Sequence, residues 1–240
     1  MAIEGTGIYI GAGLYAGQWK TGVVVNSGLA AIMFVTKKYK SALTGAGLIH
    51  ACILGILLWG PLGAAGWGTC FMYLVFGSMV TKVKMAEKEA MGIAEGRGGR
   101  RGPENVWGSA ATAAICALMS QLSPWDSALF KLAFVASLAT KLSDTCGSEI
   151  GKAYGKTTYL ITTMEKVPPG TEGAISVEGT VAGVVGSVLL GLCGLAANLI
   201  PPIGVWICVL AAFVGTNCES VIGAVFQNKY SWLTNENKYS

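Results

Sequence analysis

Apolar runs long enough to cross a bilayer recur along this chain, and they limit its fold more than any other feature. A helix needs about 20 predominantly apolar residues to span the hydrocarbon layer. Unpaired backbone polar groups are too costly in lipid, so each such run must be helical. The sequence therefore predicts an all-α, polytopic membrane helical bundle of about seven transmembrane helices. The predicted spans are 21–36, 43–60, 64–81, 106–122, 127–145, 177–199 and 205–224.

The spans also divide the chain. Only 12% of the residues are charged, against about 25% in soluble domains, which argues against an ordinary soluble enzyme. We expect residues 1–20 to form an N-terminal interfacial segment, residues 21–227 the transmembrane domain and residues 228–240 a polar C-terminal tail. The glycine-rich run at 5–17 is interpreted as a helix lying flat on the membrane, with an eighth span as the alternative. No basic region with a cleavage site precedes it, so the chain looks mature or bacterial as given.

Lysines and arginines are shared unevenly between the predicted loops. If the first span runs from outside to inside, the lysines at 37–40, the basic set at 82–101 and the later lysines all fall on one side. The opposite side keeps Lys20, with Lys131 just inside a helix. The positive-inside rule then places the charged side in the cytoplasm or the plastid stroma. The seven cysteines show no Cys-x-x-Cys pair, so we interpret them as packing residues, neither a disulfide framework nor a zinc site.

Internal repeats suggest how the spans are organised. The segment SMVTKV at 78–83 resembles SLATKL at 137–142, and CGSEIGKAY at 146–154 resembles CESVIGAVF at 218–226. We therefore predict three repeated helical hairpins, made from spans two and three, four and five, and six and seven. Their marked ends would meet on the basic side, and sites in such proteins lie where repeats meet.

Polar chemistry is concentrated in residues 139–179. At helical spacing Lys141, Thr145, Ser148 and Lys152 form one stripe, with Asp144 and Glu149 on its two flanks. Ionisable groups placed toward a membrane interior are costly and are therefore taken as functional. Asp144 is the strongest case, with an ion pair to Lys141 as the purely structural alternative.

Three loop segments add anion-binding character. The run GRGGRRG at 96–102 offers guanidinium forks suited to phosphate, although such a run also suits lipid headgroups, nucleic acid or simple solvation. The run GKAYGKT at 151–157 is one residue short of a phosphate loop and follows a membrane helix, so a nucleotide-hydrolase fold is rejected while an anion site is kept. The run PPGTEG at 168–173 excludes helix and forms a stiff turn. The residues that these loops contribute to the predicted site are Arg97, Arg100, Arg101, Lys156, Thr157, Thr171, Glu172 and Gly173.

Further polar groups stand at the ends of the last two spans. Ser176 and Glu178 open the sixth span, and Asn217 and Glu219 lie near the inside end of the seventh. The lone His50, inside the second span, is interpreted as a hydrogen-bonding residue of the bundle and not as a catalytic group.

These motifs carry a family resemblance. The segments KLSDT at 141–145, SEIGKAYGKTTYL at 148–160, VPPGTEGA at 167–174, SVEG at 176–179 and AEGRGGRRGP at 94–103 resemble the integral-membrane phytyl-phosphate kinases of photosynthetic organisms. The likeness covers about residues 30–227. It implies phosphorylation of phytyl phosphate to phytyl diphosphate, the prenyl donor for tocopherol (vitamin E), in phytol salvage. A looser similarity reaches membrane phytol and dolichol kinases and phosphatidate cytidylyltransferases, which use CTP.

The resemblance implies a division of roles within the site. Asp144 and Glu149, with Glu178 or Glu219, would hold Mg²⁺, since carboxylates and water suit this ion. Lys141, Lys156, Arg100 and Arg101 would neutralise phosphate oxygens, and the prenyl tail would lie among the hairpins. The implied partners are the lipid membrane, an isoprenyl phosphate and a nucleoside triphosphate, CTP before ATP, with no nucleic acid, in a plastid or cyanobacterial membrane. The alternative is a membrane transporter or channel for a polar substrate, which would place charged groups at several depths; a purely structural scaffold explains the clustered acids less well.

Overall fold

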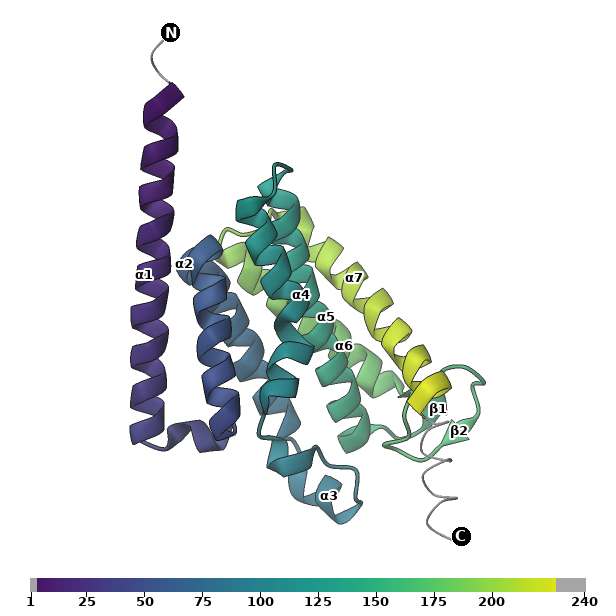
Figure 1. The fold of residues 1–240 in the computed structure, drawn as a ribbon. Coiled ribbons are helices and arrows are strands. Elements are labelled where there is room, and N and C mark those ends of the chain that lie inside the picture. Colours follow the sequence, from purple (N-terminus) through teal and green to yellow (C-terminus); the bar gives the residue numbers. More distant parts are fainter. Residues whose placement is uncertain (1–3, 228–240) are drawn as a thin grey trace.

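The computed structural model describes residues 4–227, so the tail predicted at 228–240 lies outside the described residues. The described part is mostly helical (Figure 1). Its α-helices are α1 (Glu4–Val35), α2 (Gly45–Thr81), α3 (Met85–Ala90), α4 (Pro103–Leu122), α5 (Ser127–Tyr154), α6 (Val177–Ala196) and α7 (Pro202–Ile222). Short turns of 3₁₀ helix, η1 (Lys38–Ser41) and η2 (Gly96–Gly99), and a π-helical turn, η3 (Gly223–Gln227), complete the helical elements.

Helix α2 is folded back on itself and holds two of the predicted spans. Pro61 lies inside it, and Gly63 has φ 61° and ψ −154°, a conformation that breaks the helix. Proline lacks the backbone donor that a continuous helix needs, and glycine alone adopts such a positive φ at low cost. The two arms on either side of this turn correspond to the predicted spans 43–60 and 64–81.

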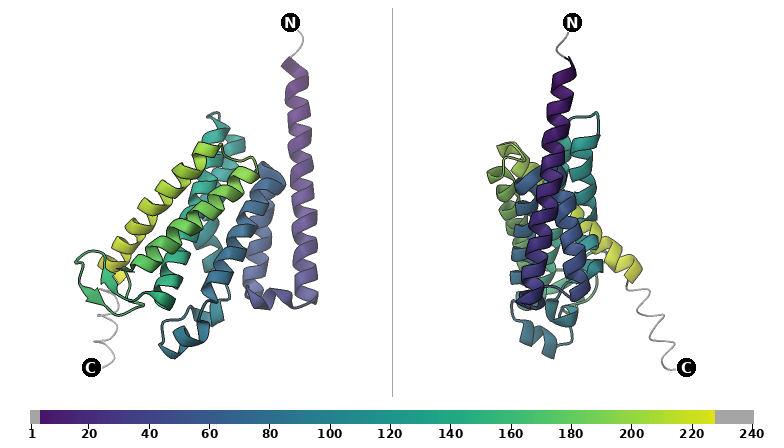
Figure 2. Two further views of the ribbon diagram at one scale, coloured as in Figure 1. Left: turned by 180° about the vertical axis from the view of Figure 1, so that it is seen from behind. Right: turned by 60° about the vertical axis from the view of Figure 1, so that its left-hand side comes forward.

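Three antiparallel hairpins follow one another along the chain. They are the two arms of α2, the pair α4 and α5, and the pair α6 and α7, and all three open toward the same end of the bundle (Figure 1, Figure 2). The turn between α4 and α5 is fixed by Asp126, whose carboxylate accepts a hydrogen bond from the N–H of Ala128 at 2.8 Å. The repetition of sequence between the hairpins remains a prediction.

Helix α5 is the centre of the bundle, since it packs against α2, α4, α6 and α7. Its inward face carries Phe134, Leu138 and Leu142, all fully buried. Small residues let α6 approach closely: a Cβ added to Gly183 would lie 2.9 Å from the hydroxyl of Ser143, and one on Gly179 would lie 2.5 Å from a carbonyl of α5. Close packing through small residues is how membrane helices associate without a hydrophobic driving force.

The first helix differs from the prediction of a separate N-terminal segment ending at residue 20. The structure has one uninterrupted helix of 32 residues, Glu4–Val35, and its first part projects beyond the other helices (Figure 1). At 1.5 Å per residue this helix is about 48 Å long, more than the roughly 30 Å of a hydrocarbon layer. A flat orientation of residues 5–17 would need a bend before the first span, and α1 has none.

A small β-sheet departs from the all-α prediction. Strands β1 (Thr158–Leu160), β2 (Lys166–Val167) and β3 (Ala174–Ile175) form an antiparallel sheet in the order β2-β1-β3. The two prolines at 168–169 exclude helix here, and the backbone groups of this polar segment pair with one another in place of a helical ladder. The fold is therefore a helical bundle with one small sheet at its polar end.

Length and composition mark three of the described helices as able to cross a membrane. They are α2, α6 and the stretch Pro202–Phe226, which joins α7 to the turn after it. Large apolar side chains on the outer surface of the last hairpin, such as Val181, Trp206 and Leu210, are exposed. Helix α5 carries the lysines and acids of the predicted site and is largely enclosed by its neighbours.

Candidate functional site at the polar end of the bundle

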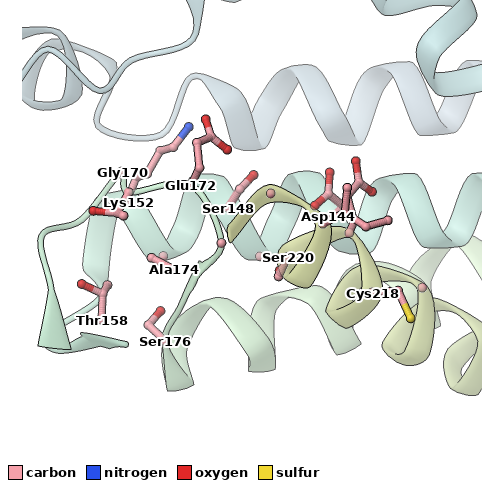
Figure 3. Close-up of a pocket in the computed structure, with 18 residues that line it drawn as sticks. Asp144, Ser148, Lys152, Thr158, Gly170, Glu172, Ala174, Ser176, Cys218 and Ser220 are labelled. Carbon is pink, nitrogen blue, oxygen red and sulfur yellow. The ribbon is translucent and has the colours of Figure 1, made fainter. Parts of the chain in front are cut away.

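The polar end of α5 borders a cavity of about 640 Å³. Its wall comes from α5, the loop that carries β1 to β3, and α7 (Figure 3). This volume lies within the range of about 300–1,000 Å³ typical of ligand sites. Eight of the predicted site residues line it: Asp144, Ser148, Lys152, Thr171, Glu172, Gly173, Ser176 and Glu219.

Glycine geometry places the loop against the end of α7. Gly170 and Gly173 have φ of 89° and 76°, so both adopt the left-handed region that other residues avoid. A Cβ on Gly173 would lie 2.6 Å from the carbonyl oxygen of Ser220 on α7. On the other side, Ser176 caps α6 by accepting a hydrogen bond from the N–H of Gly179 at 3.1 Å. The predicted stiff turn thus forms the wall of the cavity that faces α5.

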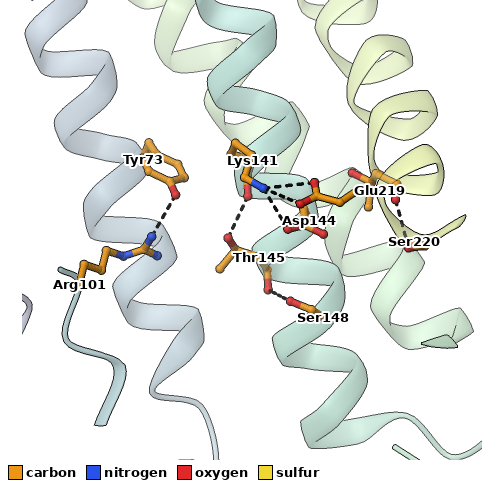
Figure 4. Close-up of polar contacts among 9 residues, drawn as sticks. Tyr73, Arg101, Lys141, Asp144, Thr145, Ser148, Glu219 and Ser220 are labelled. Atoms are coloured by element: carbon orange, nitrogen blue, oxygen red, sulfur yellow. Dashed lines mark hydrogen bonds and ion pairs between the residues drawn. The ribbon is translucent and has the colours of Figure 1, made fainter. Parts of the chain in front are cut away.

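Lys141 joins two carboxylates beside this cavity (Figure 4). Its Nζ lies 2.8 and 3.1 Å from the two carboxylate oxygens of Glu219 and 3.5 Å from Oδ2 of Asp144. We call Lys141, Asp144 and Glu219 the Lys141 cluster. The side chains of Asp144 and Glu219 remain 29% and 49% exposed, so both carboxylates are open to a ligand.

Arg101 and Tyr73 continue the polar side chains from the Lys141 cluster across the bundle. Nη1 of Arg101 donates a hydrogen bond to the hydroxyl of Tyr73 at 3.0 Å, and the guanidinium also lies over the tyrosine ring. Tyr73 in turn lies between Arg101 and Lys141 in Figure 4. Arg101 is therefore brought toward the site from the loop before α4, although it does not line the 640 Å³ cavity.

Glu149 belongs to a second group, which is closed. Its Oε2 accepts from the ammonium of Lys88 on α3, and its Oε1 lies 3.3 Å from Nζ of Lys152. Lys88 also donates to the carbonyl of Thr81 at 2.8 Å and is fully buried, as is nearly all of Glu149. We call Lys88, Glu149 and Lys152 the Lys88 cluster. Because both oxygens of Glu149 are held by lysines and the residue does not line the cavity, we revise its predicted metal-binding role to a structural one.

The Gly-Lys-Thr segment stands beside the cavity and not in it. Lys156 is exposed, and its backbone N–H faces Oε1 of Glu178 at 3.4 Å. Neither Lys156 nor Thr157 lines the cavity, while the neighbouring Thr158 does and donates its hydroxyl to the carbonyl of Val167. The predicted anion site at 151–157 is therefore not gathered with the acids, and Glu178 is half-buried against this loop.

The arginines of the Arg/Gly run separate into different environments. Arg97 pairs with Glu104 and donates to Oδ1 of Asn105 at 3.1 Å, so it fixes the start of α4. The hydrogen bond from Arg97 holds the pKa of the Glu104 carboxyl below its usual value. Arg100 is exposed and bonds only to the carbonyl of Arg97 among the described residues, at 3.2 Å. Neither side chain reaches the cavity.

The structure also defines the surroundings of Asn217, His50 and the cysteines. Asn217 lines a smaller cavity of about 70 Å³ that shares Asp144 and Ser148 with the larger one. His50 accepts a hydrogen bond from the indole of Trp107 at 2.9 Å, which confirms its predicted role in the bundle. All seven cysteines are free.

Sequence reasoning missed Lys88 and Tyr73 as part of the polar end. Lys88 lies in a salt-bridged helix, and its partner on α5 is 61 residues away, so no local pattern marks it. Tyr73 carries a hydroxyl within an apolar arm of α2, and that isolated polar group is the signal that could have found it.

The donor chemistry of the Lys141 cluster fits a magnesium ion. Among the described residues there is no group of three His, Cys, Asp or Glu that could hold a metal without further ligands. Mg²⁺ in phosphoryl-transfer sites is held by one or two carboxylates together with substrate phosphates and water. Asp144 and Glu219 share one ammonium, which shows that both carboxylates reach a common point where a cation is favoured.

Fold and site together define a helical membrane protein with a polar cavity at one end of its bundle. Residues 28–239 match the family described as Integral membrane protein DUF92, and the chain belongs to this family. The family resemblance inferred from the motifs is thereby confirmed, and the chain is an integral membrane protein.

Three relatives illustrate the range of the family. The chain is 52% identical to Uncharacterized membrane protein sll0875 of Synechocystis sp., over 91% of this chain and 84% of that one. It is 46% identical to Protein VTE6, chloroplastic, of Arabidopsis thaliana, over 91% of this chain and 66% of the relative. It is 31% identical to Uncharacterized membrane protein MJ0933 of Methanocaldococcus jannaschii, over 80% of this chain and 78% of that one. No solved structure matches the chain.

Proposed function

We propose that this protein is a membrane prenyl-phosphate kinase that converts phytyl phosphate, or a similar isoprenyl phosphate, to the diphosphate and so supplies tocopherol synthesis. The observation that carries the proposal is the Lys141 cluster, in which two half-exposed carboxylates share one ammonium beside a cavity of about 640 Å³. The motif resemblance and the 46% identity to the chloroplastic relative support the choice of reaction. The cyanobacterial and chloroplastic relatives support a plastid or cyanobacterial membrane. The uneven distribution of lysines and arginines between the loops supports a polar end on the stromal or cytoplasmic side.

The reaction requires little acid–base chemistry from the protein. A lipid phosphate has a second pKa of about 6, so near neutral pH it is already largely ionised. One of its oxygens attacks the terminal phosphorus of the donor, and the bond from that phosphorus to the bridging oxygen breaks, releasing the nucleoside diphosphate. Positioning and neutralisation of charge are what such a transfer needs.

The chain's own residues supply these two requirements. Asp144 and Glu219 would hold Mg²⁺, which when bound neutralises the charge on the transferring phosphates. Lys141 keeps the two carboxylates together, and Lys152 places a second ammonium at the wall of the cavity. The loop at 170–173 closes the side opposite α5, where the donor nucleotide, proposed to be CTP, would lie.

The test uses purified protein in detergent or lipid nanodiscs with Mg²⁺. Labelled CTP and ATP are supplied separately, with phytol, phytyl phosphate and geranylgeranyl phosphate as acceptors. We expect a labelled lipid diphosphate from CTP and phytyl phosphate, and its loss in Asp144→Asn. Asp126→Asn is the matched control, because it makes the same change at the other end of α5, where asparagine also caps a helix well. No labelled diphosphate in any combination would reject the kinase and favour a transporter.

A further inference from the structure

A separate cavity, of about 380 Å³, lies between α1 and the two arms of α2. Its wall is almost entirely apolar, with Leu29, Leu54 and Leu58 among its residues. A cavity of this kind excludes a nucleotide and suits a hydrocarbon chain.

Two polar side chains, Asn26 and Arg101, stand out in this wall. The Asn26 amide is satisfied, because its oxygen accepts from the indole of Trp67 at 2.9 Å and its nitrogen donates to the carbonyl of Gly22 at 2.9 Å. Arg101 is different. It donates to the Tyr73 hydroxyl and forms no ion pair with a carboxylate among residues 18–226, whose side chains the structure describes. A guanidinium has five donors in a planar fork, so most of its capacity is left for a ligand.

The protein holds this guanidinium in place with several contacts. The backbone N–H of Arg101 donates to the carbonyl of Ala42 at 2.8 Å, and its own carbonyl accepts from Thr44 at 3.0 Å. Two glycines make room for it: a Cβ on Gly47 would lie 2.3 Å from the Arg101 carbonyl oxygen, and one on Gly77 would lie 2.8 Å from Nη2. A half-buried arginine fixed in this way is a built feature of the fold and not a solvated loop charge.

Two residues that line this cavity are not sealed from the surroundings of the protein: Leu29 on α1 and Phe71 on α2 remain 39% and 46% exposed. A route for a hydrocarbon chain between α1 and α2 is part of the proposal made for this cavity.

We propose that this cavity binds the tail of a single-chain lipid monophosphate whose phosphate pairs with Arg101. The identity of that lipid as the isoprenyl phosphate acceptor rests on the proposed function. The acceptor thus approaches from the α1 and α2 side, while the donor occupies the 640 Å³ cavity beside α7. Arg101 donates to Tyr73, which lies between Arg101 and Lys141 in Figure 4, so an acceptor phosphate at Arg101 would face the donor across Tyr73.

Photo-crosslinking tests this placement without depending on catalysis. The probe is a phytyl monophosphate with a diazirine at the end of its tail, added to the protein in phosphatidylcholine nanodiscs. Peptide mapping is expected to find the label within 18–81, and excess phytyl phosphate should remove it. Phytol, inorganic phosphate and dioleoyl phosphatidate, added separately, should compete at least about tenfold less well, because each lacks the phosphate, the tail or the single-chain shape.

Matched variants distinguish a block of the cavity from a general disturbance of α1. Ala30→Phe places a large ring in the cavity, whereas Ala31→Phe makes the same change at the next, exposed position of α1. We expect Ala30→Phe to reduce labelling about tenfold or more and Ala31→Phe to leave it unchanged. Arg101→Gln should raise the KM for phytyl phosphate about tenfold with a smaller change in kcat, and Arg101→Lys should recover part of the loss.

The possible outcomes distinguish the two proposals. Labels confined to α5, α6 or α7, or equal effects of Ala30→Phe and Ala31→Phe, would overturn the tail site even in an active kinase. Equal competition by dioleoyl phosphatidate would overturn it in favour of a general anionic-lipid site. Specific labelling of α1 and α2 in a protein that makes no diphosphate would support the lipid site and reject the kinase.

Discussion

Two lysine–carboxylate groups lie little more than one turn apart on α5, and they differ in what surrounds them. In the Lys88 cluster both oxygens of Glu149 are held by lysines, and Lys88 is fully buried. In the Lys141 cluster one ammonium serves two carboxylates that remain 29% and 49% exposed. A buried carboxylate whose oxygens are already paired has no capacity for a ligand, whereas two partly exposed carboxylates around one ammonium can also bind a cation. The comparison therefore favours a structural role for Glu149 and leaves the Lys141 cluster as the candidate for the chemistry.

The largest expected effect comes from breaking the Lys88 cluster. Glu149→Gln leaves the Lys88 ammonium buried without an anion, and removing one partner of a buried pair costs about 3–5 kcal/mol. We expect a clear loss of thermal stability in detergent and weaker attachment of α3 to α5. Replacing both partners, as Lys88→Met with Glu149→Met, should restore most of the stability, because no buried charge is then left unpaired.

Thermal unfolding of the single and double variants in one detergent checks this prediction. A stable Glu149→Gln protein that had lost all kinase activity would reverse the assignment and return Glu149 to the chemistry. If the Lys88→Met, Glu149→Met variant were no more stable than Glu149→Gln, the pair would stabilise the protein by more than the mutual neutralisation of two buried charges.

Asp144→Asn should give the opposite pattern. The substitution removes a charge from a half-exposed carboxylate, so stability should change little. Activity should fall about 10²- to 10³-fold, the usual cost of losing one group that stabilises charge in a transition state. Diphosphate formation and the melting temperature, measured on the same preparation, test whether activity falls while stability is kept. A drop in melting temperature as large as that of Glu149→Gln would remove the contrast between the clusters.

Lys141→Met should have an intermediate effect. Without the ammonium, the carboxylates of Asp144 and Glu219 repel each other and separate, so the pair loses its common geometry. Groups that orient metal ligands typically contribute about 10- to 100-fold to activity or metal affinity, and we expect a loss of that size. Lys141→Arg should recover part of it, and raising Mg²⁺ should partly compensate Lys141→Met. Activity titrated against Mg²⁺ measures the recovery in Lys141→Arg and the compensation in Lys141→Met. An unchanged Mg²⁺ dependence in Lys141→Met would argue against one ion held by both Asp144 and Glu219.

The comparison also shows what the sequence could predict. Helical periodicity placed Asp144, Ser148 and Lys152 on one side of α5, and the structure finds all three at the cavity. The same reasoning gave Glu149 a metal-binding role beside Asp144, because both are acids on the flanks of one stripe. The difference between them depends on Lys88, which reaches Glu149 from a helix 61 residues earlier, and a helical wheel contains no such contact.

The conformation of the loops was the other feature that the sequence could predict only in part. The prolines at 168–169 predicted a stiff turn, and that turn lines the cavity, but pairing of β1 with β2 and β3 depends on hydrogen bonds between short polar segments with no hydrophobic pattern. Likewise the Arg/Gly run predicted phosphate contact for three arginines alike. Tertiary contacts separate them: Arg97 meets Glu104, Arg100 stays exposed, and Arg101 turns back toward Tyr73.

The smallest effect is expected for a neutral hydrogen-bonded pair, which serves as a reference for the two charged clusters. Trp107→Phe removes the indole donor that His50 accepts at 2.9 Å, in the contact between α2 and α4. A neutral hydrogen bond contributes about 0.5–1.5 kcal/mol, so the loss of stability should fall well below that of Glu149→Gln. Activity per folded molecule should stay unchanged, since neither residue lines the cavity. If thermal unfolding instead gave equal losses for Trp107→Phe and Glu149→Gln, burial of charge would not be what distinguishes the Lys88 cluster. The contrast with the Lys141 cluster would then depend on exposure alone.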